Sequence, residues 1–347
     1  MRLWIDIDNP PQARYLSPLV PVFRRRGHEV FVTARNNQIT HELLSQSGIR
    51  FVSVGSAFGP TLPQKLIGVL RRAGSLRRRV RQAGNAKCLV ASSRSSALAA
   101  RSLGIPAFIF CDYEHVELAS YRLAGAHLIF PDVIHPDVFV SKGFSEDHLL
   151  PFHGLKEDLT FAGLQPRGVP PPELSLEGDE IFQVLIRPPA DESHYANRRS
   201  RDLLTALLDH LASRSDVRVV LSPRNPRQVS QLATHRWAQE PVVLRRAVPT
   251  EHLFAAVDWV ICGGGTMLRE AAYLGVPAIG IFGGKPGSVD AYLTKVGAIR
   301  MVTLAEQLDD IDWRGPVAPQ PVPRNPDLID ELSRALEMRM PESPESD

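Results

Sequence analysis

The stretch 262-CGGGTMLREAAYLGVP-277 places three consecutive glycines between an apolar run and a segment with the composition of a helix. A short apolar run bounded by glycine is typical of a buried strand, so the glycines are expected to close a strand and open a helix. Backbone N–H groups at a helix start lack partners within the helix, and the helix dipole is positive there. We therefore predict an anion-binding turn formed by Gly263, Gly264, Gly265 and Thr266.

The acid in this stretch does not occupy the position that helix capping predicts. Thr266 is a good N-cap candidate, and a capping box would then place the acid at position 269. That position holds Arg269, and the acid is Glu270. Glu270 is therefore predicted to bind a ligand group next to the anion, such as a ribose diol. The alternative is that Glu270 only complements the helix dipole and that the glycines only permit a tight turn.

Outward from this stretch, short apolar runs alternate with helix-like segments along the chain. Continuous apolar strands separated by helices are typical of a buried parallel sheet. Strands are expected at 2–8, 28–35, 50–55, 87–93, 106–112, 126–132, 181–187, 217–224, 241–245, 259–265, 277–284 and 299–302. The pattern predicts an α/β fold of two Rossmann-like, doubly wound parallel-sheet domains that face a cleft.

Proline and glycine mark the expected domain boundaries. Four prolines and three glycines interrupt the alternation at 163–180, which we interpret as a linker. It separates a domain at 1–162 from a second domain at 181–315. A proline-rich crossing, an amphipathic terminal helix and a disordered tail are expected within 316–347.

The composition is that of a soluble globular protein. Of the 347 residues, 44% are hydrophobic and 22% are charged, and the net charge is +2. Cys88, Cys111 and Cys262 have no metal-ligand spacing, which favours a reduced compartment and predicts no metal site. The start of the chain lacks the pattern of a signal peptide, and no window has the roughly 18 apolar residues of a membrane span. A cytoplasmic location is expected.

One basic run departs from this average. Residues 71–87 carry seven Lys or Arg and no acid, and the apolar stretch 65–70 precedes them. The more common meaning of such a run is a solvated helix face. The alternative is that 65–87 makes a peripheral contact with anionic lipid at the inner face of the membrane, or approaches a lipid-linked acceptor. No aromatic residue interrupts the run, so nucleic acid is not an expected partner.

Familiar nucleotide and phosphate motifs do not fit. The first strand is followed by 9-NPPQAR-14 instead of a GxGxxG turn, and neither glycine-rich stretch of the second half has P-loop spacing. These observations disfavour dinucleotide-linked redox enzymes and P-loop kinases. A phosphatase nucleophile motif at 6-DIDN-9 is also disfavoured, because Asn9 stands where that motif has Thr or Val.

Several motifs together, in matching order along nearly the whole chain, resemble the predicted-glycosyltransferase family called domain of unknown function 354. They are WIDIDNPP at 4–11, RRGHEVFVTAR at 25–35, CDYEH at 111–115, GLKED at 154–158, IRPPADESHY at 186–195 and GGGTMLREAAYLGVP at 263–277. The last also resembles the donor-binding motif of GT-B proteins such as the lipid II-forming glycosyltransferase and the non-hydrolysing UDP-N-acetylglucosamine 2-epimerase. The resemblance implies a GT-B-like fold that holds a nucleotide-diphosphate-sugar mainly in the C-terminal domain, with no cofactor.

Carried over to this chain, the resemblance places the donor phosphates on the amides of the Gly263–Thr266 run and the ribose on Glu270. Arg187, at the end of a strand, is expected near the same phosphates, because a guanidinium suits a diphosphate. The alternative for Arg187 is a structural ion pair. An epimerase has two adjacent acids where this chain has Arg269 and Glu270.

Acids at strand ends are the candidate catalytic groups of the N-terminal, acceptor-side domain. Asp6 and Asp8 close the first strand, and Asp112 and Glu114 follow the fifth. Alternate positions on a strand point to the same side, and paired carboxylates can divide acid and base roles. We predict Asp8, Asp112 and Glu114 to be catalytic; the alternative is that they cap helices or bind loop amides.

Three polar residues nearby are candidate substrate ligands: Asn9, Ser93 and Ser95. The two serines belong to a hydroxyl-rich turn at 92–96, which can equally serve as an N-cap. Related GT-B enzymes often carry a histidine base in the first loop, whereas this loop holds Gln12, which cannot accept a proton at neutral pH.

The leading interpretation is a glycosyltransferase that uses a nucleotide-diphosphate-sugar, with UDP favoured, and an unknown acceptor that is either lipid-linked or a saccharide. One alternative is a 2-epimerase-like enzyme with Asp6, Asp112 and Glu114 as acid and base. Another, favoured by Gln12, is a sugar-nucleotide-binding protein without turnover.

Overall fold

The computed structural model describes most of the chain. It describes residues 1–56, 59, 61–163, 168–175, 181–189, 198–225, 228–230, 235–246, 248–315 and 318–340. Much of the expected linker, the end of the motif at 186–195 and the expected tail at 341–347 lie outside the described residues.

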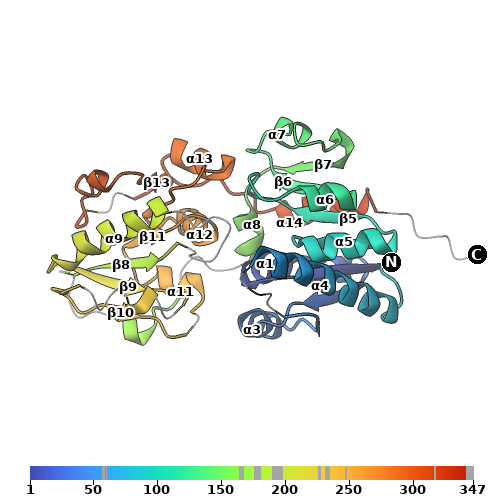
Figure 1. The fold of residues 1–347 in the computed structure, drawn as a ribbon, viewed down its shortest axis with the longest axis horizontal. Coiled ribbons are helices and arrows are strands. Elements are labelled where there is room, and N and C mark those ends of the chain that lie inside the picture. The colour runs from blue at the N-terminus through green and yellow to red at the C-terminus, as the bar shows by residue number, and fades with distance from the viewer. Residues whose placement is uncertain are drawn as a thin grey trace, which may run out of the picture. The chain divides into compact units, whose positions relative to one another are not determined.

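The chain divides into two compact units, each built on one parallel sheet (Figure 1). The first unit comprises residues 1–163 and 324–347, and the second comprises residues 164–323. The predicted fold class is confirmed in both units: every pairing between neighbouring strands is parallel, and described helices lie between consecutive strands except between β9 and β10.

The first unit contains a seven-stranded sheet in the order β3-β2-β1-β4-β5-β6-β7. Its strands are β1 (Arg2–Ile7), β2 (Glu29–Ala34), β3 (Val52–Ser53), β4 (Cys88–Ala91), β5 (Ala107–Phe110), β6 (His127–Pro131) and β7 (Leu149–Phe152). Its helices are α1 (Pro10–Leu16), α2 (Leu19–Arg25), α3 (Gln38–Gln46), α4 (Leu62–Gln82), α5 (Arg94–Leu103), α6 (Ala119–Ala124), α7 (Asp137–Val140), η1 (Glu146–His148), α8 (Lys156–Thr160) and α14 (Leu328–Glu337). The strand order reverses between β1 and β4, and ligands of open α/β sheets bind at the carboxyl ends of such strands.

The second unit repeats this winding in a six-stranded sheet, in the order β10-β9-β8-β11-β12-β13. Its strands are β8 (Phe182–Arg187), β9 (Val217–Leu221), β10 (Val242–Val243), β11 (Trp259–Cys262), β12 (Ala278–Gly280) and β13 (Arg300–Met301). Its helices are η2 (Pro172–Leu174), α9 (Arg198–Ala212), α11 (Thr250–Phe254), α12 (Thr266–Tyr273), α13 (Ser288–Lys295) and η3 (Ala305–Leu308). The reversal here lies between β8 and β11, so the carboxyl ends of these two strands are the expected ligand position.

The helices are held by apolar stripes that face the sheets. In α9, five leucines recur at helical spacing and are buried in the core of the second unit: Leu203, Leu204, Leu207, Leu208 and Leu211. The terminal helix α14 packs in the first unit, because Leu328, Leu332 and Leu336 belong to that unit's core.

Candidate functional site

The glycine turn, Gly263–Gly265, has a backbone that only glycine adopts without strain. Gly264 has φ +88° and Gly265 has φ +86° with ψ −152°. A Cβ atom at Gly263 would lie 2.5 Å from the Cα of Pro189, whereas a Cβ at Gly265 would meet nothing within 4 Å. The turn is therefore fixed by its backbone, and the space above Gly265 is open at the start of α12.

The N-cap of α12 is Gly265, so the expectation that Thr266 caps the helix was wrong. Thr266 is the first helical residue, and no side chain makes a capping hydrogen bond. The physical reason is that the positive φ of Gly265 turns the chain into the helix one residue earlier than a Thr cap would. The first amides of α12 are consequently not covered by a capping side chain, as an anion site requires.

Arg187 ends β8 beside the glycine turn. Cys262, the last residue of β11, is its partner across the sheet, and the Gly263 N–H donates to the Arg187 carbonyl at 3.2 Å. The guanidinium donates from Nη1 to the carbonyls of Ser222 and Pro223, at 3.0 and 3.1 Å, and to the Ser222 hydroxyl at 2.9 Å. These neutral oxygens orient the group without neutralising its charge.

The environment of Arg187 is unfavourable for a cation. Within the described residues it makes no ion pair, so the alternative of a structural ion pair finds no support there. Burial, and then the charge of Arg224, lower the pKa of Arg187 to about 10. A desolvated guanidinium beside another guanidinium is a position that a bound anion would stabilise.

Cys262 shows which charges surround the start of the glycine turn. Burial raises the pKa of this thiol to about 12, Arg224 and Arg187 lower it in part, and Glu270 raises it. Both arginines and Glu270 therefore lie within electrostatic reach of the residue that precedes Gly263. Arg224 donates from Nε to the Pro188 carbonyl at 3.1 Å, which keeps it next to the end of β8.

The two charged residues in the middle of α12 have different surroundings. Arg269 is buried and donates to Asp290 of α13 at 2.7 Å, so its role is to join two helices. Glu270, 3% exposed, lies one turn after Thr266 on the same helix. The ribose contact of Glu270 stays a prediction.

In the first unit, Asp6 is fully buried in a polar network. Arg72 donates to both oxygens of Asp6 at 2.8 Å, and hydroxyls of Thr33 and Ser93 donate at 2.7 and 3.1 Å. Trp4 donates in turn to Thr33 at 2.8 Å. Both carboxylate oxygens of Asp6 are therefore engaged by protein groups, which disfavours its predicted role as an acid or base and favours a structural one.

Asp8 lies just beyond β1 between two guanidinium groups. Its Oδ1 is 2.8 Å from Nη2 of Arg35 and 3.2 Å from Nη1 of Arg72, and its side chain is 16% exposed. Burial raises the pKa of Asp8, and the charges of Arg72 and Arg35 offset part of this increase. Asp8 is thus the more exposed of the two acids at the end of β1.

Asn9 and Gln12 form the start of α1. The Asn9 side chain is the N-cap and accepts from the Gln12 N–H at 3.0 Å. The Gln12 amide accepts from the Asp8 N–H at 2.7 Å and donates to the Ser92 carbonyl at 3.3 Å. Both side chains therefore shape the loop that carries Asp8.

Asp112 and Glu114 do not share one environment, contrary to the expectation from strand alternation. β5 ends at Phe110, so both acids lie in a loop to which that alternation does not apply. The Asp112 side chain is 33% exposed and forms an ion pair with the buried Lys156 of α8. The Glu114 side chain is 4% exposed and lies 3.7 Å from the His115 ring.

The hydroxyl-rich turn after β4 serves as a cap. Ser93 is the N-cap of α5 and accepts from the Ser96 N–H at 3.2 Å, while its hydroxyl also donates to Asp6. Ser95 is 2% exposed. Ser93 thus acts as an N-cap, the alternative that its sequence position left open. Substrate binding by Ser93 or Ser95 stays a prediction.

Sequence reasoning missed four charged residues at these edges: Arg35, Arg72, Lys156 and Arg224. Arg35 and Arg224 are the last residues of expected strand runs, which was a usable signal. Arg72 lies in the basic run but falls on the stripe Val69, Ala73, Leu76 and Val80, all buried at helical spacing. The helical spacing of these apolar residues was therefore a signal in the sequence that Arg72 is buried, unlike the other arginines of the run.

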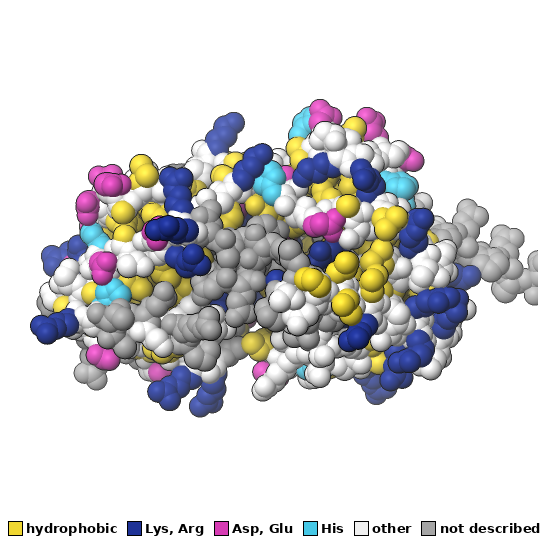
Figure 2. Space-filling model, viewed as in Figure 1, with side chains coloured by type: hydrophobic (Ala, Val, Ile, Leu, Met, Phe, Trp, Pro, Cys, Tyr) yellow, Lys and Arg dark blue, Asp and Glu magenta, His cyan; other side chains and the backbone are white. Residues whose placement is uncertain are grey.

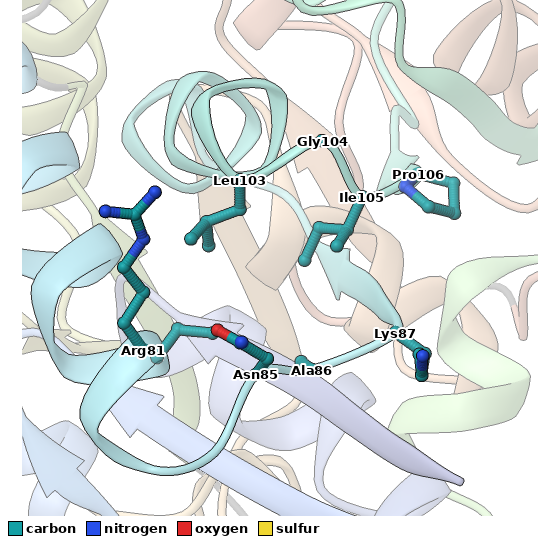
Figure 3. A pocket seen from close by; sticks show the side chains of 9 residues that line it. Arg81, Asn85, Ala86, Lys87, Leu103, Gly104, Ile105 and Pro106 are labelled. Atoms are coloured by element: carbon teal, nitrogen blue, oxygen red, sulfur yellow. The ribbon is translucent and has the colours of Figure 1, made fainter.

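A cavity of about 410 Å³ lies elsewhere in the first unit (Figure 3). It is lined by the end of α4, the residues before β4 and those before β5, including Arg81, Lys87 and Pro106. These positions are at the amino ends of the strands, opposite to the edge that carries Asp8. The cavity is therefore not part of the candidate site.

Two comparisons relate the chain to known proteins. The family model described as "Protein of unknown function (DUF354)" matches residues 1–311. The chain belongs to the DUF354 family. A relative from Methanocaldococcus jannaschii, "Uncharacterized protein MJ0665", is 28% identical over 305 residues, which cover 84% of each chain.

The DUF354 chain also resembles solved structures of known enzymes. The UDP-GlcNAc 2-epimerase from Neisseria meningitidis, bound to UDP-GlcNAc, superposes with a TM-score of 0.74 at 13% identity, covering 97% of this chain and 100% of the enzyme. MurG from Acinetobacter baumannii superposes with a TM-score of 0.51 at 15% identity, with the same coverage. At these identities the likeness concerns the fold, and this DUF354 protein has a GT-B-like fold.

The three cysteines of this DUF354 protein are expected to be inert in the native state. Burial raises the pKa of Cys88, Cys111 and Cys262 to about 12, so almost no thiolate exists at neutral pH. We expect a disulfide reagent such as DTNB to modify none of them before unfolding and all three in denaturant. Rapid labelling of Cys262 in the folded protein would contradict the buried position of the β11 end.

Proposed function

We propose that this protein binds a nucleotide-diphosphate-sugar in its C-terminal unit and transfers the sugar to an acceptor bound at its N-terminal unit. The observation that carries the proposal is Arg187: a desolvated guanidinium without an ion pair in the described residues, held by neutral oxygens beside the glycine turn. Amides at the start of α12 and Arg224 add donors and positive charge at the same strand ends. A diphosphate matches this combination in charge and in the number of hydrogen-bond acceptors.

UDP is the favoured nucleotide. The fold resembles that of an enzyme bound to UDP-GlcNAc over nearly the whole chain. In the proposal, Gly264, Gly265 and Thr266 bind the phosphates through their amides, and Glu270 binds the ribose hydroxyls. No resident cofactor takes part.

Transfer then needs a leaving group that is stabilised and an acceptor that is deprotonated. The bond between the anomeric carbon and the diphosphate oxygen breaks, and Arg187 with the α12 amides stabilises the charge that develops on the diphosphate. The acceptor oxygen forms the new bond to that carbon while its proton passes to the Asp8 carboxylate. The raised pKa of Asp8 favours this role, because a base is most effective when its pKa approaches the working pH. Asp112 and Glu114, in the loop after β5, are further candidates.

A second candidate function is sugar-nucleotide epimerisation, which the likeness to the epimerase fold favours. Since both oxygens of Asp6 are occupied, the acid and base would be Asp112 and Glu114. Incubation with UDP-GlcNAc alone separates the two functions. An epimer formed without acceptor supports the second, whereas transfer to an added acceptor supports the first.

Nucleotide binding itself is tested by a thermal-shift screen of UDP, GDP, CDP and TDP and their sugars. A ligand at about 100 times its Kd adds roughly 2.7 kcal/mol to the stability of the state that binds it. We expect a UDP ligand to give the largest shift and Glu270→Ala to reduce it. Glu306→Ala, an exposed acid of the same unit, is the matched control and should respond like the wild type. Lack of stabilisation by every nucleotide would refute the donor site, and stabilisation without product across an acceptor panel would indicate a binding protein.

A further inference from the structure

The outward face of α4 combines exposed apolar and cationic side chains. Leu66, Ile67 and Leu70 are 64%, 48% and 56% exposed in the first half of the helix. Arg71, just before the midpoint of the helix, and Arg77, Arg78 and Arg81, in its second half, are also exposed. With 3.6 residues per turn, none of these positions falls on the buried stripe: Leu66, Leu70, Arg77 and Arg81 flank it on one side, and Ile67, Arg71 and Arg78 lie on the side opposite to it. We call this surface the α4 face.

The charge of this region is of one sign. No Asp or Glu occurs in the sequence between Glu42 and Asp112, whereas 11 Lys or Arg lie in that interval. Figure 2 shows Lys and Arg side chains gathered over this part of the first unit, with hydrophobic side chains beside them. Since the whole chain has a net charge of only +2, this positive charge is concentrated locally rather than spread over the protein.

We propose that the α4 face docks on an anionic lipid surface. Exposed leucines and isoleucine insert into the apolar boundary of a bilayer, and arginines on the same face bind the phosphates of its headgroups. A second copy of this chain does not match the face, because two cationic faces repel each other. Single-stranded nucleic acid lacks a stacking partner, because the sequence from 61 to 107 contains no Phe, Tyr or Trp.

The docking is peripheral. In the described part of the chain, no helix is both long and apolar enough to cross a membrane. α4 itself has 21 residues, but its exposed second half is cationic and its opposite face packs on the unit.

The position of α4 connects this surface to the candidate acceptor site. The helix begins after the carboxyl end of β3, and Arg72, at its midpoint, binds both Asp6 and Asp8 from the buried side. The apolar part of the α4 face therefore lies near the strand edge that carries Asp8. Of the two acceptor classes, a lipid-linked one is favoured; this point rests on the proposed glycosyltransferase function, whereas the docking itself does not.

Vesicle flotation tests the proposal with the full-length protein. We expect flotation with vesicles of phosphatidylglycerol and phosphatidylcholine, and none with phosphatidylcholine alone. Binding should fall at an ionic strength of about 1 M, where charges are screened beyond about 3 Å. Arg77→Gln/Arg78→Gln/Arg81→Gln should weaken partitioning about a hundredfold, because each cation near an anionic surface contributes about a factor of five.

Matched variants separate docking from general charge and from misfolding. Arg24→Gln/Arg25→Gln/Arg50→Gln removes the same charge from exposed positions of the same unit and should weaken binding far less. Leu66→Ser/Ile67→Ser/Leu70→Ser should abolish insertion, whereas Leu304→Ser, 53% exposed in the other unit, should not. Circular dichroism confirms that each variant is folded.

The proposal would be overturned by no flotation of the wild type with anionic vesicles, by equal loss in the two arginine triples, or by preferential capture of single-stranded RNA. A dimer of the wild type that the Leu66, Ile67 and Leu70 changes dissociate would point to a second copy and overturn it too. The thermal shift by nucleotides should survive in every α4 variant. If vesicles bind but no nucleotide stabilises the protein, the docking surface stands and the proposed function fails.

Discussion

Arg72→Met is expected to lower the free energy of unfolding of the N-terminal unit by about 3–5 kcal/mol. Arg72 is 1% exposed and its guanidinium binds both oxygens of the fully buried Asp6 at 2.8 Å. Removing one partner of such a pair leaves the other as an uncompensated charge in a low-dielectric interior. The loss should appear as a lower urea midpoint, followed by circular dichroism and by hydrogen exchange of the β1 amides.

The neighbouring residue provides the control for this prediction. Arg71 is exposed on the same helix, so Arg71→Met should change stability by less than about 0.5 kcal/mol. Adding Asp6→Asn to Arg72→Met removes the orphaned charge and should restore part of the loss, which a double-mutant cycle measures. Equal stability of Arg71→Met and Arg72→Met would contradict the buried network.

The second large effect is expected for ligand binding at Arg187. A hydrogen bond to a charged group is worth about 1.5–3 kcal/mol, so Arg187→Gln should weaken binding of the preferred nucleoside diphosphate by about 10- to 150-fold. Titration calorimetry measures this change. Arg187→Lys keeps the positive charge but loses the planar guanidinium with its paired donors. Its affinity for the nucleoside diphosphate should therefore lie between those of the wild type and Arg187→Gln.

Arg187→Gln should also behave differently from a structural mutation. Burial and Arg224 lower the pKa of Arg187 to about 10, so the charged form persists at neutral pH but is less stable in the free protein than in water. Without ligand, the variant should therefore be as stable as the wild type or more stable, while its stabilisation by nucleotide is lost. Arg300→Gln, an exposed arginine of the same unit, should change neither property. Unchanged diphosphate affinity of Arg187→Gln, or an equal loss of uridine binding, would show that Arg187 does not bind the phosphates.

Much of the fold and part of the candidate site could be predicted from the sequence alone. Continuous apolar runs between helices predict a parallel sheet because both faces of such a strand are covered. The glycine turn could also be located in the sequence, because its conformation depends on a few neighbouring residues. Gly264 and Gly265 adopt backbone angles that other residues avoid. Arg187 and Asp8 could be identified as candidates because they lie at or just after the ends of strands. The end of a strand can be located in the sequence, without knowledge of tertiary contacts.

The tertiary structure decided which of these residues meet and which are already occupied. Asp6 and Asp8 look equivalent in the sequence, but Arg72, 66 positions away, binds both oxygens of Asp6 and leaves Asp8 partly open. Likewise, Lys156 pairs with Asp112 across 44 positions, and Arg224, in the loop after the adjacent strand β9, lowers the pKa of Arg187. Local patterns report burial and backbone angles, since these depend on a few neighbouring residues. Ion pairs between strand ends depend on the order of strands in the sheet and on which face of a helix packs, and these follow only from the folded chain.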